Sequence, residues 1–470
     1  MALPVSRRSM LRGLALMAIM GPLAACAQTA APTPTAVVTK SPQTAAGSTP
    51  TPIPTAGRSS TSAHTTIRLH ARLGPEDDMW AQILPKFEQA YNAKVQLEQF
   101  SGGEYIQKLQ TLAAGGQMGD VIHIFTGDSS FQLFAANGVL VSLDNFIAAD
   151  RFDLGQYYKY CVDSCKVDGK YYGLPFKGHP SRCGIFFNKT LFDAASVKYP
   201  TNDSTYDDLV EAAKNLHKVG SSGVEVYGWT NPGTGDLEWY IIMSRFGGGE
   251  LYIENGTKSG LTDSDAQWGW AWTYNMMNVH KVMLNPLQTN PSVTDLFRSG
   301  KLAMARLNIG TKAAFASITN FKWGMTVAPK GPKGKRGTLA ETDVVGLTKF
   351  SQVKDTGWKL LQYITSREAG LALAKQTGGG RSATPGARPD VYESEEFLNL
   401  PYPEGVQQNT LVAMREVEPF VQPANFRGPE VMRAIDPYYE SLILNRSKPD
   451  QKFFSTMNQA VQEILDKPRP

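Results

Sequence analysis

Acidic residues are absent from the sequence before Glu76, and cysteine and histidine are scarce throughout it. Five of the 47 basic residues lie before residue 66, so the formal net charge of +4 comes from the N-terminal segment. The rest of the chain is nearly neutral, which excludes the basic surface of a nucleic-acid-binding protein. Only four cysteines in 470 residues exclude a disulfide-dense small protein.

Metal-binding and nucleophilic motifs are also missing. The six histidines are scattered without His-x-x-x-His spacing, and the cysteines form no Cys-x-x-Cys pair. No Gly-x-Ser-x-Gly, P-loop or zinc signature occurs. We therefore expect no metal, no cofactor and no enzymatic activity. A glycan-active enzyme stays open as an alternative, because it needs only two carboxylates and the chain has 43 acidic residues.

Long hydrophobic runs are lacking as well. Hydrophobic residues make up 42% of the chain, charged residues 19%, and the mean hydropathy is −0.27, which excludes a multi-span membrane protein and a fully disordered chain. The apolar run over residues 14–19 is too short to cross a bilayer. It follows Arg7 and Arg8 and precedes Cys26, an order typical of an export signal over residues 1–26.

The export signal indicates where the protein is placed. Arg7 and Arg8 resemble a twin-arginine signal, with the general secretory route as the alternative. Small residues before Cys26 resemble a bacterial lipobox, in which cleavage frees this cysteine for acylation; a plain cleavage site is the alternative. Residues 27–65 are nearly all Ala, Thr, Pro and Ser, which predicts a disordered tether. We expect a protein lipid-anchored to the outer face of the cell membrane, or periplasmic.

Beyond the tether, strand patterns alternate with helix patterns. Strand-like segments at 67–71, 94–100 and 120–125 are separated by amphipathic helical segments at 79–91 and 105–114. Such alternation is typical of a parallel sheet with crossover helices. The second half continues in this way, with expected helices and strands at 205–216, 226–230, 302–307, 323–327, 344–348, 358–376 and 453–465. The sequence predicts an α/β protein of two lobes, each with a mostly parallel sheet.

Five groups of residues, in chain order, resemble the family 1 extracellular solute-binding proteins of ABC importers, which include maltose-binding protein. They are Gly119–Ile122 with Gly138–Asp144, Val167–Pro175 with Gly184–Phe192, Thr205–Leu216, Phe297–Met304, and Trp358–Glu368 with Gly380–Pro385. The segments Phe176–Cys183 and Glu341–Gly346 depart from the family pattern.

The resemblance implies a type II periplasmic-binding-protein fold with a hinge between two lobes. Lobe one would hold residues 66–178 and 345–395, and lobe two residues 182–342 and 396–470. It implies a monomer that binds a mono- or oligosaccharide between the lobes and delivers it to ABC permease subunits. Open alternatives are a non-sugar solute (a sugar phosphate, a glycerol phosphodiester or a polyamine) and a surface sensor or structural lipoprotein without transport partners.

Candidate ligand-binding residues follow from what a sugar requires, namely an aromatic platform beside hydrogen-bonding side chains. Trp239 is the expected platform, with Asp236 and Glu238 beside it, because the resembled family places aromatic or acidic residues here. Trp229, at the end of a predicted strand, is a second aromatic candidate. Packing in the core is the alternative for both tryptophans.

Four further candidates come from strand ends and from the unusual segment. Arg72 and Asp128 follow predicted parallel strands, at the edge where open α/β sheets bind ligands. His179 and Arg182 lie in the segment that departs from the family pattern. A solvated surface position is the alternative for Arg72 and Asp128.

The cysteines beyond Cys26 are Cys161, Cys165 and Cys183. Outside the cytoplasm a pair of them is expected to be oxidised, and an odd number leaves one thiol over. We expect a Cys165–Cys183 disulfide, because a Cys161–Cys165 bond would distort a helical turn.

Overall fold

The computed structural model describes residues 64–470, apart from residues 75, 289 and 376–383. Arg7, Arg8, Cys26 and nearly all of the expected tether lie outside the described residues, so their roles stay predictions. Residues Ser62–Pro470 form one compact unit. Within the described part, no helix is both long enough and apolar enough to cross a membrane.

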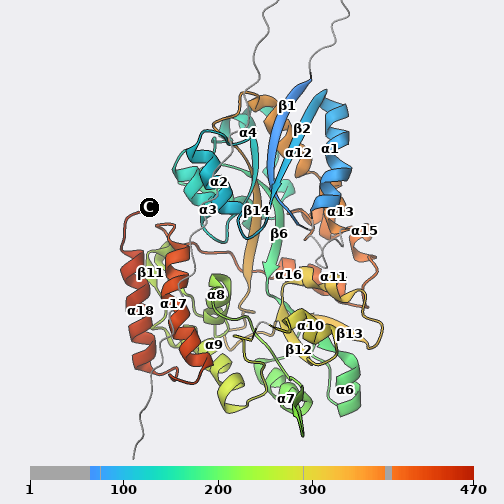
Figure 1. The fold of residues 1–470 in the computed structure, drawn as a ribbon, viewed down its shortest axis with the longest axis vertical. Coiled ribbons are helices and arrows are strands. Elements are labelled where there is room, and N and C mark those ends of the chain that lie inside the picture. The colour runs from blue at the N-terminus through green and yellow to red at the C-terminus, as the bar shows by residue number, and fades with distance from the viewer. Residues whose placement is uncertain (1–63, 75, 289, 376–383) are drawn as a thin grey trace, which may run out of the picture. The chain divides into compact units, whose positions relative to one another are not determined.

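A five-stranded sheet lies in the upper half of the view in Figure 1. Its order is β2 (Ala93–Phe100), β1 (Thr65–Arg72), β3 (Val121–Phe125), β14 (Leu339–Leu347) and β6 (Leu174–Ser181). Strands β1, β2 and β3 are parallel, as the sequence predicted, whereas β14 runs antiparallel to both β3 and β6.

Helices cover both faces of this sheet because successive strand residues point to opposite sides. Val121 joins the apolar cluster that packs α1 (Asp77–Tyr91) and α12 (Lys354–Ile364) on one face. The next residue, Ile122, joins the cluster that packs α2 (Tyr105–Ala114) on the other face.

The second sheet has three strands, in the order β12 (Met304–Leu307), β7 (Gly184–Asn188) and β13 (Trp323–Val327). All its pairs are antiparallel, so the expectation of a mostly parallel sheet in each lobe is wrong here. The connection between β7 and β12 contains several helices and short strands that pack as a helical layer, so it is not the single crossover helix that usually joins neighbouring parallel strands.

Aromatic side chains fill the core of that helical layer. Trp239, Trp270 and Tyr439 are fully buried there. The layer consists of α7 (Tyr206–Leu216), α8 (Leu237–Arg245) and α9 (Ser264–Tyr274) from the connection between β7 and β12, joined by α17 (Gly428–Ile443) and α18 (Gln451–Leu465) from the C-terminal part of the chain. Thr205 caps α7 by accepting the backbone N–H of Asp208, as expected for a threonine at this position.

The remaining elements are short. They are α3 (Ser130–Ala136), α4 (Asp144–Asp150), α5 (Lys159–Ser164), β4 (Lys166–Val167), β5 (Lys170–Tyr171), α6 (Lys189–Ala195), β8 (Lys218–Gly220), β9 (Gly223–Val226), β10 (Tyr252–Ile253), β11 (Lys258–Ser259), α10 (Val293–Arg298), α11 (Lys312–Phe315), α13 (Arg367–Ala374), α14 (Pro389–Tyr392), α15 (Glu395–Leu398) and α16 (Val406–Arg415). The single helix expected at 358–376 is divided, because α12 ends at Ile364 and Ser366 caps α13 by accepting the N–H of Ala369.

Strands β6 and β14 connect the two sheets (Figure 1). β6 pairs with β14 in the five-stranded sheet, and only two residues separate its end from β7 in the second sheet. Polar side chains at every second position of these strands face the same way. Lys177, His179 and Ser181 repeat in this way on β6, and Glu341 and Asp343 on β14.

Candidate functional site

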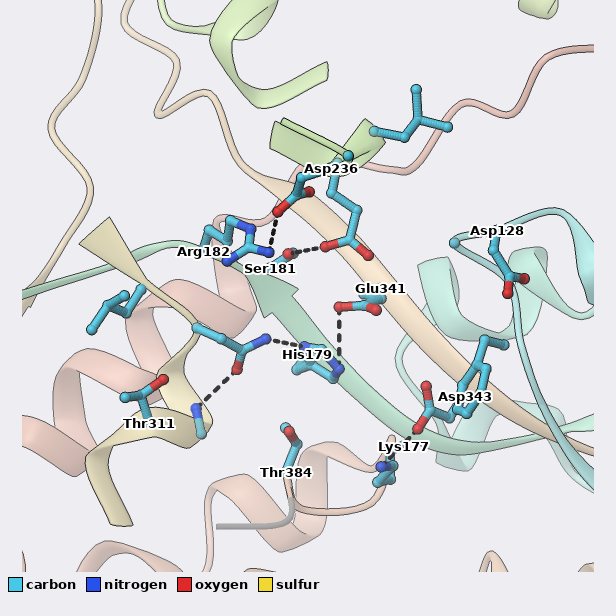
Figure 2. A pocket seen from close by; sticks show the side chains of 18 of the residues that line it. Asp128, Lys177, His179, Ser181, Arg182, Asp236, Thr311, Glu341, Asp343 and Thr384 are labelled. Atoms are coloured by element: carbon cyan, nitrogen blue, oxygen red, sulfur yellow. Dashed lines mark hydrogen bonds and ion pairs between the residues drawn. The ribbon is translucent and has the colours of Figure 1, made fainter. Parts of the chain in front are cut away.

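A cavity of about 1010 Å³ is lined by residues from both sheets and from the helical layer. Its polar lining comes from the end of β1 and the loop after β3, from β6 and β14, and from the start of α8 (Figure 2). Further polar residues come from α10 and the residue before it and from the segment after β12, among them Asp295, Arg298 and Asn308. Apolar contacts come from Phe125, Leu307 and Met432.

Six of the eight residues proposed from the sequence line this cavity. They are Arg72, Asp128, His179, Arg182, Asp236 and Glu238. Arg72 ends β1, and Asp128 follows β3 by three residues. The carboxyl ends of these parallel strands meet at one edge of the sheet, which places both side chains at the cavity. Their contact with a ligand stays a prediction.

The two tryptophans do not line the cavity, which corrects the expected aromatic platform. Trp239 is 0% exposed and donates its Nε1–H to the hydroxyl of Tyr439 at 3.1 Å. Trp229 is 1% exposed and donates to Asn231 Oδ1 at 2.7 Å. Both rings pack among other aromatic rings of the core. Burying a tryptophan in a core is as favourable as stacking it on the ring face of a sugar, so the residue type does not distinguish the two environments.

The expected Cys165–Cys183 disulfide is also wrong. Cys161, Cys165 and Cys183 are free and buried. Cys165 packs in the core of the five-stranded sheet and Cys183 in a separate cluster around the second sheet, so the two sulfurs belong to different cores. Burial raises the pKa of Cys183 to about 12 and keeps its thiol protonated.

A buried ion-pair network borders the cavity. Lys177 Nζ lies 2.7 Å from Asp343 Oδ2 and also binds Glu76. Arg72 Nη2 lies 3.3 Å from Glu76, and His123 Nε2 lies 3.2 Å from Asp343. Burial disfavours the charge of Glu76, but the combined attraction of Lys177, His123 and Arg72 outweighs it and lowers the pKa to about 2. These acids are therefore ionised and neutralised at physiological pH.

Two other carboxyl groups at the cavity lack such neutralisation. Among the described residues, no Lys or Arg forms an ion pair with Glu238 or Glu341, and Ser181 donates its hydroxyl to Glu238 at 2.5 Å. Burial and then the charge of Asp343 raise the pKa of Glu341 to about 7. Burial and the neighbouring Glu341 raise the pKa of Glu238 well above its usual range.

Gly127 leaves room for these two carboxyl groups. A Cβ at this position would lie 3.1 Å from Glu238 Oε1 and 3.8 Å from Glu341 Oε1. The absence of a side chain on β3's following loop thus allows an acid from α8 and an acid from β14 to face the same space.

The orientation of His179 is fixed by Asn308. The backbone N–H of Gly310 donates to Asn308 Oδ1 at 2.9 Å, so the amide nitrogen of Asn308 faces His179 Nδ1 at 3.3 Å. Burial lowers the pKa of His179 to about 4, so the ring is neutral and carries its proton on Nε2. That nitrogen lies 3.4 Å from Glu341 Oε2.

Arg182 and Asp236 form an ion pair at the opposite side of this space (Figure 2). Asp236 also caps α8 by accepting the N–H of Trp239 at 3.0 Å, which fixes its carboxylate. The Nε of Arg182 is buried and has no hydrogen-bond partner among the described residues.

A metal ion is poorly suited to the one cluster of ligand-type atoms in the described residues. Atoms of His179, Glu341 and Asp343 lie within 4.8 Å of one another. However, the Asp343 carboxylate already binds Lys177 and faces His123. A metal cation bound there would be repelled by the ammonium group of Lys177. Ion pairing within the protein therefore explains this cluster better than a metal site does.

Sequence reasoning missed Lys177, Ser181, Glu341 and Asp343, although all four line the cavity. Their signal was the alternation of polar residues within the two segments that depart from the family pattern. Alternation identifies a polar strand face, but only the pairing of β6 with β14 shows that the two faces meet.

Comparison with known proteins gives several relatives. A binding protein from Brucella abortus (strain 2308) is 29% identical over 280 residues, which are 56% of this chain and 62% of that protein. The multiple sugar-binding protein of Streptococcus mutans is 23% identical over 184 residues, or 39% of this chain and 42% of the relative. The chain thus spans about three fifths of the first of these relatives.

Solved structures match over most of the chain. An ABC substrate-binding protein from Listeria monocytogenes in complex with cycloalternan has a TM-score of 0.74 at 23% identity, over 86% of this chain and 99% of its own. Maltose-bound MalE3 of T. maritima has a TM-score of 0.69 at 21% identity, over 85% and 100%. These similarities show the two-lobed type II binding-protein fold. The family model for bacterial extracellular solute-binding proteins matches residues 74–371, which is more than half of the sequence, and the chain belongs to that family.

Proposed function

We propose that this protein binds a carbohydrate in the cavity and delivers it to an ABC permease outside the cytoplasm. The observation that carries the proposal is the lining of the cavity. It combines donors and acceptors from both sheets with the apolar side chains of Phe125, Leu307 and Met432. Sugars present hydroxyl groups around apolar ring faces, so this combination suits them. The sugars named for the structural neighbours support the same ligand class.

The proposal includes a division into lobes that move about a hinge. Lobe one would comprise residues 66–178 and 345–395, and lobe two 182–342 and 396–470. A ligand held by Asp128 of the first and Asp236 of the second would favour closure, since it binds the closed form better. We further propose a monomer, exported through its first 26 residues and anchored by acylated Cys26, that binds its ligand without chemical change.

A thermal-shift panel on Ser62–Pro470 tests the ligand class. The panel holds mono- and oligosaccharides beside sugar phosphates, glycerol phosphodiesters and polyamines. A ligand at 100 times its dissociation constant stabilises the protein by about 2.7 kcal/mol, which raises the melting temperature by a few degrees. We expect carbohydrates alone to do so. A shift with only a phosphate or polyamine would contradict the ligand class.

Glycan hydrolysis is a second candidate, favoured by one observation. Glu238 and Glu341 are neighbouring acids with raised pKa values, the property of a general acid. Chromatography of each stabilising oligosaccharide after prolonged incubation distinguishes the two functions. We expect the oligosaccharide to be recovered intact, and shorter products that disappear in Glu341→Gln would establish the enzyme instead.

A further inference from the structure

The cavity has more acidic than basic groups, and each buried basic group already has an acidic partner. Arg72 faces Glu76 at 3.3 Å and lies over the ring of Phe125. Lys177 is held by Glu76 and Asp343. The third cation, Arg182, is paired with Asp236. Arg182 also attracts Glu238 and Glu341, but its ion pair is with Asp236, and the exposed Arg298 is a fourth cation at the cavity.

Four carboxyl groups at the cavity remain without an ion-paired Lys or Arg among the described residues: Asp128, Glu238, Asp295 and Glu341. Asp128 accepts only neutral donors, the hydroxyl and the N–H of Ser130. Figure 2 shows Asp128 and Glu341 on two sides of the same space, with Ser181 on a third. The groups come from the loop after β3, from α8, from α10 and from β14, so the acidic character is not a feature of one segment.

We propose that the carbohydrate carries a protonated amine, and that this ammonium group binds between Glu238 and Glu341. The inference rests on the proposed function and makes its substrate class an aminated sugar. An ammonium has three N–H donors and no acceptor. Two carboxylates and the hydroxyl of Ser181 can accept all three, and the positive charge neutralises acids that the protein leaves unpaired.

No neighbouring Lys or Arg among the described residues forms an ion pair with Glu238 or Glu341, although Arg182 and Lys177 attract these acids from a greater distance. His179 is neutral, and the hydrogen bond from Asn308 directs its remaining N–H toward Glu341. Asp343, on the same strand as Glu341, adds negative charge, which Lys177 offsets only in part. Without ligand, Glu238 and Glu341 therefore hold a proton near neutral pH that an ammonium would displace.

The proton held by Glu238 and Glu341 makes the affinity for an aminated ligand depend on pH. An aminated ligand releases a proton when it binds, so its affinity should rise from about pH 5.5 to about pH 7, while its amine is still protonated. A neutral sugar that hydrogen-bonds to the protonated pair should show no such increase. The charged and titratable groups that face the pair are Arg72, Asp128, Lys177, His179, Arg182, Asp236 and Asp343.

Isothermal titration of Ser62–Pro470 with matched ligands tests this inference. Cellobiose is compared with the deacetylated chitosan disaccharide, in which an ammonium replaces the hydroxyl at C2 of each ring. We expect the aminated sugar to bind at least about tenfold more tightly near neutral pH, the scale of a hydrogen-bonded charge pair. The preference should fall below about threefold in Glu238→Gln and Glu341→Gln, and persist in the surface variant Glu211→Gln.

Each outcome separates the two claims. Equal or tighter binding of cellobiose overturns the inference and leaves carbohydrate binding in place. A preference for the aminated sugar that survives both Gln variants overturns its assignment to this pair. If no carbohydrate binds, the proposed function fails and the inference fails with it. The pH dependence of the unmodified protein gives a readout that does not depend on the variants folding.

Discussion

Lys177 Nζ lies 2.7 Å from Asp343 Oδ2, and this buried ion pair joins strands β6 and β14 where they border the cavity. Glu76 also binds the same ammonium. The pair thus links two strands whose positions are more than 160 residues apart in the sequence. It lies where the chain passes from the five-stranded sheet toward the second sheet.

Replacing Lys177 by Met should cost about 3–5 kcal/mol of unfolding free energy, because Glu76 and Asp343 would keep buried charges without their ammonium. Urea unfolding followed by circular dichroism measures the change. The exposed Lys258→Met on β11 serves as the control and should leave the unfolding midpoint unchanged. Equal midpoints for the two variants would show that the buried network adds nothing to stability.

Stability should depend on pH through Glu341. Its pKa is about 7 in the folded protein and near 4.5 in the unfolded chain, so the folded state holds a proton that the unfolded state has lost. Unfolding free energy from this group therefore falls as pH rises between about 5 and 7, and it stays lower above that. Glu341→Gln should stabilise the protein more at about pH 8 than at about pH 5. The same gain at both values would contradict the raised pKa.

Trp239→Phe should destabilise the protein by about 1–3 kcal/mol, because the hydrogen bond to Tyr439 is lost and the smaller ring leaves space in the core. Its affinity for the ligand should match that of the unmodified protein. Unfolding and titration of the same preparation measure both quantities. A large loss of affinity with unchanged stability would restore Trp239 as a ligand platform.

The three described cysteines should react with a thiol reagent only after unfolding, because all are buried and burial raises the pKa of each thiol. Counting modified thiols with Ellman's reagent in buffer and in guanidinium, without reductant, gives the number directly. Three reactive thiols in guanidinium are expected. A single one would mean that a disulfide has formed.

The sequence predicted the parallel strands and the residues at their ends because these features are local. Arg72 and Asp128 were found in this way, and both line the cavity. The pairing of Glu341 with the face of His179 is not local, since it depends on the register between β6 and β14. Trp239 shows a different limit. The sequence around a tryptophan does not tell whether the ring packs in a core or contacts a sugar, and only the burial seen in the structure distinguishes these two positions.

Isothermal titration of one carbohydrate into three forms of Ser62–Pro470 tests the central claim, that the cavity is the ligand site. The forms are the unmodified protein, Arg182→Gln in the cavity and Arg433→Gln on the exposed face of α17. We predict equal affinity for the unmodified and Arg433→Gln proteins, and affinity at least about tenfold weaker for Arg182→Gln, since it loses a charged donor and leaves Asp236 unpaired. Equal affinity for all three forms would show that the carbohydrate binds elsewhere.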